Sequence, residues 1–196
     1  MERSSRFLSL SGLSGIFIGC YALAGAIAAW WHLNNNSFTI NGHYSLATTF
    51  DGEAFRPFLT FFMCDALLVL GVSLITAFIL TQRFAKKQGL QIWDASAKRL
   101  LINLLIPLVT GGIFCLILLQ HQRIGLIAPS MLIFYGLSLL NASKYTYNDI
   151  RNLGIVEIIL GLIAAANPGY GLLCWALGFG IMHIIYGVTM YYKYER

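Results

Sequence analysis

Six stretches of about 20 mostly apolar residues divide this chain, and they restrict its fold more than any other feature. A helix of that length crosses the hydrocarbon layer of a bilayer, which is about 30 Å thick. Inside lipid a chain must satisfy its own backbone hydrogen bonds, so such a stretch is expected to be an α-helix. We therefore predict an all-α, polytopic transmembrane helical bundle that forms a single domain over residues 1–196. The six predicted spans are 8–31, 58–81, 100–119, 124–143, 152–168 and 170–192.

The composition agrees with a membrane location. Hydrophobic residues make up 58% of the 196 residues and charged residues 11%, whereas a soluble domain carries about a quarter charged residues. The net charge of +5 would suggest nucleic acid in a soluble protein, but here the basic residues stand between the spans, and we expect no nucleic-acid binding. The first apolar stretch exceeds the length of a signal peptide's apolar region and ends at Trp30 and Trp31, so we expect it to be retained.

The positions of the basic residues predict the orientation. With the N-terminus in the cytoplasm, eleven lysines and arginines fall on the inner side and only Arg56 and Arg123 on the outer side. Because basic residues favour the cytoplasmic face, we predict that both termini are cytoplasmic and that the protein lies in a bacterial inner membrane. The eleven inner residues are Arg3, Arg6, Arg83, Lys86, Lys87, Lys98, Arg99, Lys144, Arg151, Lys193 and Arg196.

Two connecting segments and one residue spacing suggest interactions. The inner loop 83–99 carries five positive charges and one negative charge, which favours contact with anionic lipid or, alternatively, docking of a cytoplasmic protein partner. The outer loop 32–57 contains Asn41–Gly42, a pair typical of a β-hairpin turn, and we expect a solvated connection there. Gly15 and Gly19 have a spacing that lets helices approach closely; packing within the bundle is favoured over a homo-oligomer.

Ionisable side chains inside a span are candidates for function, because a charge there costs about 2.5–3.5 kcal/mol. Three stand out: Asp65, Glu157 and His183. Glu157 precedes the predicted turn at Gly169 by twelve residues and His183 follows it by fourteen, so both are expected at the same depth in the inner half of the bilayer. Asp65 is either protonated or water-exposed, or it belongs to an outer-facing site near Arg56. The pair is either a static packing contact or a site that carries a proton or a small polar ligand.

The same counting about the turn near residues 121–122 places Asn103 and Asn141 at matching depth. A binding cluster of these amides with the Glu157–His183 pair is therefore a candidate site, and Gly154 and Gly161 are expected to leave room beside Glu157. Asp65 and Glu157 each lie in the second helix of one half of the chain, if the halves are helices one to three and four to six. Such a pattern is either coincidence or an inverted repeat of the kind found in transporters.

Motifs for catalysis, cofactors and metals are missing from the sequence. It contains no G-x-S-x-G, H-E-x-x-H, Walker or Rossmann pattern, so we expect neither an enzyme nor a cofactor. The cysteines lie in apolar runs without a C-x-x-C pair, which predicts buried free thiols rather than a metal site. Potential ligands in the outer loop lack metal-ligand spacing. The residues concerned are Cys20, Cys64, Cys115 and Cys174, and in the loop His32, His43, Asp51 and Glu53.

Four segments of the chain carry a resemblance: FLSLSGLSGIFIGCYALAGA, WDASAKRLLINLLIPLVTGGIFCLILL, NASKYTYNDIRNLGIVEIILGL and GYGLLCWALGFGIMHIIYGV. They resemble a family of uncharacterised bacterial six-helix integral membrane proteins. The resemblance covers nearly the whole chain, implies no established activity and assigns no functional residue. Three functions are open: a membrane sensor or scaffold that acts through a cytoplasmic partner, which is favoured; a small proton- or ion-coupled transporter that uses Glu157 and His183; and an intramembrane enzyme, for which no nucleophile is visible.

Overall fold

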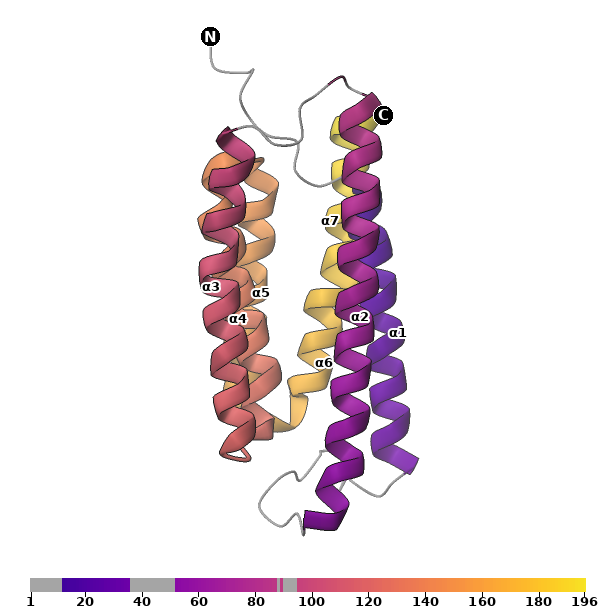
Figure 1. Ribbon diagram of the computed structural model, residues 1–196, viewed down its shortest axis with the longest axis vertical. Helices are drawn as coiled ribbons and strands as arrows, with labels where there is room; N and C mark the ends of the chain where they lie inside the picture. The colour runs from indigo at the N-terminus through magenta and orange to yellow at the C-terminus, as the bar shows by residue number, and fades with distance from the viewer. Residues whose placement is uncertain (1–11, 36–51, 88, 90–94) are drawn as a thin grey trace.

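Helices make up nearly all of the structure in the computed structural model, which describes residues 12–35, 52–87, 89 and 95–196 (Figure 1). The last helical rod runs from Gly171 to Glu195 and contains two π-helical stretches, so we call it the C-terminal helix. The prediction of an all-α bundle is confirmed. The helices are α1 (Gly12–Asn35), α2 (Gly52–Lys87), α3 (Ala95–Gln120), α4 (Ile127–Ala142), α5 (Asn148–Ala166), and, within the C-terminal helix, α6 (Gly171–Trp175), the π-helical η4 (Ala176–Met182), α7 (His183–Met190) and the π-helical η5 (Tyr191–Glu195).

Five of the six rods are long and apolar enough to cross a membrane. They are α1, α2, α3, the rod that contains α4, and the C-terminal helix. The remaining rod is α5, which has 19 residues and carries Asp149, Arg151 and Glu157. The chain is thus a multi-pass membrane protein by the length and composition of these five helices, and α5, with three charged residues, is not among them.

Several helices extend beyond the apolar stretches that predicted them. At 36 residues, α2 is about 54 Å long, which exceeds the thickness of the hydrocarbon layer. His32 and Arg56 were expected in the outer loop but belong to α1 and α2. The predicted hairpin at Asn41–Gly42 lies outside the described residues. Both α1 and α2 therefore continue past the apolar stretches that predicted them.

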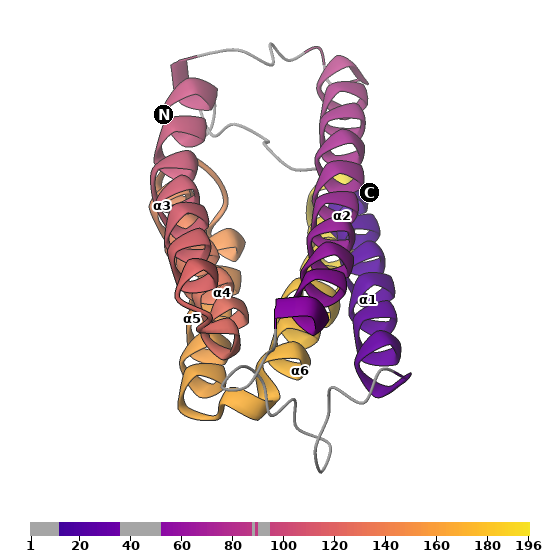
Figure 2. The ribbon, with the colours of Figure 1, turned by 60° about the horizontal axis from the view of Figure 1, so that its bottom comes forward.

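The rods form two groups of three (Figures 1 and 2). The terminal unit consists of α1, which packs on both α2 and the C-terminal helix, and the central unit consists of α4, which packs on both α3 and α5. The two units meet mainly where the C-terminal helix contacts α4 and α5. This grouping differs from the predicted division into helices one to three and four to six, because the last helix returns to pack on the first.

Glycines set the closest helix contacts in each unit. In the terminal unit, a Cβ atom on Gly15 would lie 3.0 Å from the Cα of Gly187, and one on Gly19 would lie 2.6 Å from the carbonyl oxygen of Gly180. In the central unit, a Cβ atom on Gly136 of α4 would lie 2.5 Å from the backbone oxygen of Gly154 on α5. The prediction that the Gly15–Gly19 spacing serves internal packing is confirmed, and the partner is the C-terminal helix.

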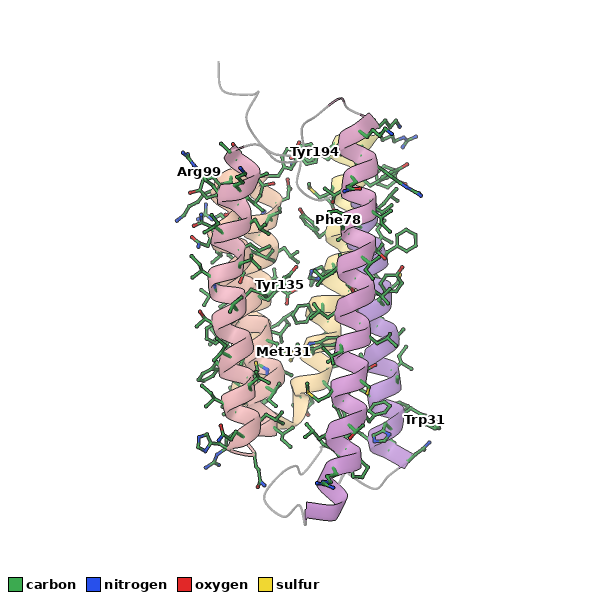
Figure 3. The ribbon with its side chains drawn as sticks, viewed as in Figure 1. Trp31, Phe78, Arg99, Met131, Tyr135 and Tyr194 are labelled. Atoms are coloured by element: carbon green, nitrogen blue, oxygen red, sulfur yellow. The ribbon has the colours of Figure 1, made fainter. Side chains whose placement is uncertain are left out.

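The outer faces of the bundle suit lipid. Leucine, isoleucine and phenylalanine side chains are exposed along α2 and α3 on most of their turns, as expected where acyl chains rather than water surround a helix. At one end, the peptide N–H of Gly12 donates to Glu195, so α1 begins where the C-terminal helix ends. Figure 3 shows Arg99 and Tyr194 at this end and Trp31 at the other. We call it the basic end, since it holds Arg83, Lys86, Lys87, Lys98, Arg99, Lys144, Arg151, Lys193 and Arg196.

Candidate functional site

Glu157 and His183 meet at the contact between the two units. Glu157 projects from α5 of the central unit, and His183 begins α7 of the terminal unit. Their Oε1 and Nδ1 atoms are 3.5 Å apart, and the side chains are 0% and 5% exposed. The equal depth predicted by counting from the turn at Gly169 is therefore matched by direct contact. Among the described residues, the only other ion pair joins Lys193 to Asp149.

Hydrogen bonds define the orientation of the histidine ring. The backbone oxygen of Gly178 lies 3.0 Å from Nδ1, and a carbonyl can only accept, so Nδ1 carries the hydrogen. The Tyr135 hydroxyl lies 2.8 Å from Nε2. In the neutral ring Nε2 has no hydrogen, so Tyr135 donates to it. The ring is thus held by a bond at each nitrogen, while its Nδ1 edge faces the Glu157 carboxyl.

Gly178 makes room for the carboxyl group. A Cβ atom at this position would collide with Oε2 of Glu157 and would lie 2.7 Å from a methyl group of Leu132. Gly178 lies within η4, the π-helical stretch that ends just before His183. Widened turns of this kind occur frequently at functional sites of membrane and soluble proteins, because they shift side chains out of the regular helical register. Here the widened stretch contains both the glycine that admits Glu157 and the carbonyl that holds His183.

Aromatic rings cover the histidine on the side facing the space between the units. The ring centroids of Phe179 and Tyr135 lie 5.9 Å and 5.4 Å from that of His183. Trp175 extends the group, with its ring 5.2 Å from Phe179. Figure 3 shows Tyr135 on the side of α4 that faces the terminal unit, with Met131 nearby. The pair is therefore enclosed by apolar and aromatic surfaces.

Both carboxyl oxygens of Glu157 are buried without a hydrogen-bond partner among the described residues. Such a group is expensive as a carboxylate, because burial removes its hydration and nothing replaces it. The titratable groups that face it are His183 and Tyr135, with Cys174 in the adjacent turns of the C-terminal helix. No lysine or arginine of the described chain forms an ion pair with Glu157. The site therefore favours a neutral carboxylic acid over an ion pair with a fixed cation.

Asn103 and Asn141 form a separate contact between α3 and α4. The Asn141 amide donates to the backbone oxygen of Asn103 over 2.9 Å, and the Asn103 amide donates to the backbone oxygen of Arg99. Lys144 reaches the Asn141 side chain over 3.4 Å. The two amides meet as the counting predicts, but no hydrogen bond or ion pair of the described residues links them to Glu157 or His183. The predicted four-residue cluster is thus two pairs, the second of them beside the basic end.

Asp65 is remote from both pairs. It is half-buried on α2, where a Cβ atom on Gly25 of α1 would lie 3.3 Å from both carboxyl oxygens. No ion pair joins it to Arg56 in the described part of the chain. The expectation that Gly154 and Gly161 leave room beside Glu157 is wrong, because both glycines face α4, where its backbone fills the space.

Two tyrosines near the pair were missed by sequence reasoning. Tyr135 binds His183, and the buried hydroxyl of Tyr186 has no hydrogen-bond partner among the described residues. Each lies in a strongly apolar stretch, where a tyrosine hydroxyl normally needs a polar neighbour. The two tyrosines could therefore have been recognised in the sequence, because a tyrosine in the middle of a span indicates a polar group beside it inside the bundle.

A cluster at the basic end completes the set of polar groups on this side of the molecule. Asp149, in the first turn of α5, accepts hydrogen bonds from Lys193 and from the Tyr194 hydroxyl, both at 3.0 Å. Partial burial raises the pKa of Asp149, but the hydrogen bonds from Lys193 and Tyr194 outweigh it, so the pKa lies below its usual value. This cluster joins α5 of the central unit to the end of the C-terminal helix.

Metal-binding and thiol chemistry find little support in the described residues. No group of three or more histidine, cysteine or acidic side chains that could hold a metal ion is found there. All four cysteines are free, but the prediction that they are buried holds only for Cys174; Cys115 is half-buried, and Cys20 and Cys64 are exposed on the outside of α1 and α2. Lipid accepts a thiol as readily as a protein core does, which explains their place.

No protein-family model, no curated protein and no solved structure matches this chain. The resemblance of the four segments to a bacterial membrane-protein family therefore stays a prediction. The evidence for the candidate site is consequently its own geometry: a buried carboxyl group lies in contact with a histidine that is hydrogen-bonded at both ring nitrogens.

Proposed function

We propose that this chain is a proton-responsive sensor or scaffold with six spans in a bacterial inner membrane, both termini in the cytoplasm, and no enzymatic activity. The observation that carries the proposal is the Glu157 carboxyl, which is fully buried, touches His183 and has no hydrogen-bond partner in the described part of the chain. A proton is the smallest ligand that relieves the cost of burying this group. An intramembrane acid beside a histidine is a common element of proton-handling proteins.

Loss of the proton is expected to change how the two units pack. An ionised Glu157 needs water, a donor or a cation, and a charge at this depth costs about 2.5–3.5 kcal/mol without them. The carboxyl lies between the units, beside Gly178 of the C-terminal helix. Separating the units there admits water to the carboxylate. Protonation therefore favours the closed contact and ionisation favours a looser one.

Such a change reaches the cytoplasmic side through the segment 83–99. This segment includes the end of α2 and the start of α3, so it connects the terminal unit to the central unit. Its five positive charges fit an acidic face of a cytoplasmic protein partner, although anionic lipid offers the same charge complementarity. A shift of one unit against the other alters the spacing of these charges, which is the signal that a partner would detect.

A proton- or ion-coupled transporter is the second candidate, and one observation favours it. The units meet through the C-terminal helix, whereas α2 and α3 leave most of their surfaces uncovered. Two units that rock about a buried polar site are the usual basis of alternating access. This alternative requires that a solute or proton crosses the bilayer, which the sensor does not.

Hydrogen–deuterium exchange tests the proposal. The full chain in lipid nanodiscs is compared at pH 5 and pH 8, with labelling times scaled for intrinsic exchange, as wild type, Glu157→Gln and the control Asp65→Asn. We expect the amides of η4, of the end of α2 (83–87) and of the start of α3 (95–99) to lose protection at pH 8 in the wild type and in Asp65→Asn, and to stay protected in Glu157→Gln. An identical response of wild type and Glu157→Gln would refute the proposal. Proton flux into dye-loaded vesicles that Glu157→Gln abolishes would favour the transporter.

A further inference from the structure

Polar and apolar groups are distributed unevenly on the two sides of the Glu157–His183 pair. Toward the end opposite the basic end, the pair is bordered by the apolar cluster of Leu132, Ala164 and Cys174, on which Phe179 packs. Toward the basic end, two tyrosines pack against the next cluster, which consists of Leu139, Ile150 and Leu153. Tyrosine hydroxyl groups thus stand on one side of the pair, whereas the cluster on the other side contains hydrocarbon side chains and one thiol.

The first hydroxyl on that side belongs to Tyr135, which donates to Nε2 of His183. The second belongs to Tyr186, three residues after His183 and therefore on the same face of α7. Tyr135 and Tyr186 both pack against the cluster that contains Leu139. The Tyr186 hydroxyl is buried, and in the described structure it has no hydrogen-bond partner. A tyrosine hydroxyl is rarely left in this state without a role.

The polar row continues to the surface at the basic end. Tyr186 packs against the cluster that contains Ile150, the residue next to Asp149, and Tyr194 follows Tyr186 eight residues later in the C-terminal helix. The rings of Tyr147 and Tyr194 stack with centroids 3.9 Å apart, and Tyr194 donates to Asp149. Asp149 also pairs with Lys193, whose side chain is 53% exposed. The row therefore begins at the protein surface and ends at Glu157.

We propose that Tyr186 and Tyr135 relay protons between the basic end and His183, so that Glu157 exchanges protons with the cytoplasmic side alone. This inference rests on the proposed function and specifies the side of the membrane from which the proton comes. The protein responds to the cytoplasmic pH and not to the external pH. The cluster of Leu132, Ala164 and Cys174 holds one thiol and no hydroxyl or carboxyl group, so it offers no comparable row of polar groups toward the other end.

The transfer balances at each atom. Tyr135 gives its hydroxyl proton to Nε2 of His183 and takes one from the Tyr186 hydroxyl, which takes one in turn from the cluster of Asp149, Lys193 and Tyr194, so each tyrosine oxygen keeps one hydrogen. The imidazolium then releases the Nδ1 proton to Oε1 of Glu157, 3.5 Å away. Glu157 becomes a neutral acid whose hydroxyl faces Nδ1, and His183 becomes a neutral ring with its hydrogen on Nε2, where Tyr135 now accepts it. This tautomer gives up the hydrogen bond from Nδ1 to the backbone oxygen of Gly178. The reverse sequence returns the proton and restores the original tautomer.

The experiment uses the full chain in right-side-out vesicles and follows the infrared carbonyl band that Glu157→Gln removes. The pH is changed on one face at a time, and the rate of proton uptake is measured after a pH jump. Tyr186→Phe removes only an unpartnered hydroxyl, so the fold is expected to persist, which a melting curve checks. The control is Tyr21→Phe, whose hydroxyl contacts Thr76 between α1 and α2.

We expect the band to follow the pH of the cytoplasmic face, and we expect Tyr186→Phe and Tyr135→Phe to slow uptake at least tenfold while Tyr21→Phe does not. The midpoint of the Tyr186→Phe titration should equal that of the wild type, since the relay affects rate and not equilibrium. A band that follows external pH, or unchanged rates in both variants, would overturn the relay and leave Glu157 as the sensing group. A chain with no titrating band that depends on Glu157 would overturn the proposed function as well.

Discussion

Replacing Gly187 by alanine tests the arrangement of the helices most directly. A Cβ atom there would lie 2.5 Å from the backbone nitrogen of Ile16 and 2.6 Å from the backbone oxygen of Gly12. Both atoms belong to the backbone of α1, which cannot move aside as the end of a flexible side chain can. The C-terminal helix and α1 must therefore separate to admit a single methyl group.

The expected cost follows from a comparison with a matched control. Inserting a methyl group into a packed contact costs about 1–3 kcal/mol, whereas alanine stabilises a helix interior over glycine by about 0.5–1 kcal/mol. Gly71 in α2 has nothing within 4 Å of its would-be Cβ atom, so Gly71→Ala gains the helix preference alone. The gain in helix propensity is the same in both variants, so it cancels when their free energies of unfolding are compared. Gly187→Ala should be less stable than Gly71→Ala by about 1–3 kcal/mol.

Equilibrium unfolding in mixed micelles, followed by circular dichroism, measures that difference. Equal stability of the two variants would mean that α1 and the C-terminal helix do not pack against each other at Gly187. The terminal unit as described above would then be wrong. Gly15→Ala, on the facing surface of α1, is expected to behave as Gly187→Ala does. A change in oligomeric state with no loss of stability in Gly15→Ala would instead support packing between copies of the chain.

Two further predictions concern the surface of the bundle. Asp149→Asn should destabilise the protein at neutral pH. Because the pKa of Asp149 is lowered in the folded protein, the stability difference from wild type should shrink as the pH falls below about 3.8, the ordinary pKa of an aspartate. Melting curves from pH 7 to 3 check this, and a stability difference that widens in acid contradicts it. A lipid-soluble maleimide should label Cys20 and Cys64, which are exposed, and should not label the buried Cys174 until the chain unfolds. Peptide mass spectrometry measures the labelling, and equal labelling of Cys174 would contradict its burial.

The depth of each polar group could be predicted from the sequence, but its neighbours could not. Counting residues from the turn between two consecutive antiparallel helices gives the depth of each residue in the membrane. The contacts between Glu157 and His183 and between Asn103 and Asn141 could therefore be predicted. Counting carries no information about rotation around each helix axis. That rotation places the amides beside Lys144, separate from the acid and histidine.

The grouping of the helices was also beyond sequence reasoning. The Gly15–Gly19 spacing predicts a close helix contact, but many helices could supply the partner, and the choice of the C-terminal helix depends on its own glycines at Gly180 and Gly187. The π-helical η4 left no signal in the sequence, because its residues are as apolar as those of a regular span. The positions of the helices can be predicted from local composition, whereas the choice of which helices pack together depends on contacts between segments that are distant in the sequence.

The contact between Gly178 and Glu157 permits a test of whether the site and the packing of the units are coupled. Gly178→Ala places a methyl group against the carboxyl oxygen and against Leu132, so it should cost about 1–3 kcal/mol. Glu157→Ala removes the carboxyl group, and in that background Gly178→Ala should cost less, since only the contact with Leu132 remains. The control is Gly180→Ala, which meets Leu23 on α1 and should cost the same in both backgrounds. A coupling energy of about 0.5 kcal/mol or more between positions 157 and 178 is expected for residues in contact. Strict additivity would place Glu157 away from the C-terminal helix and would remove the physical link by which its protonation reaches the terminal unit.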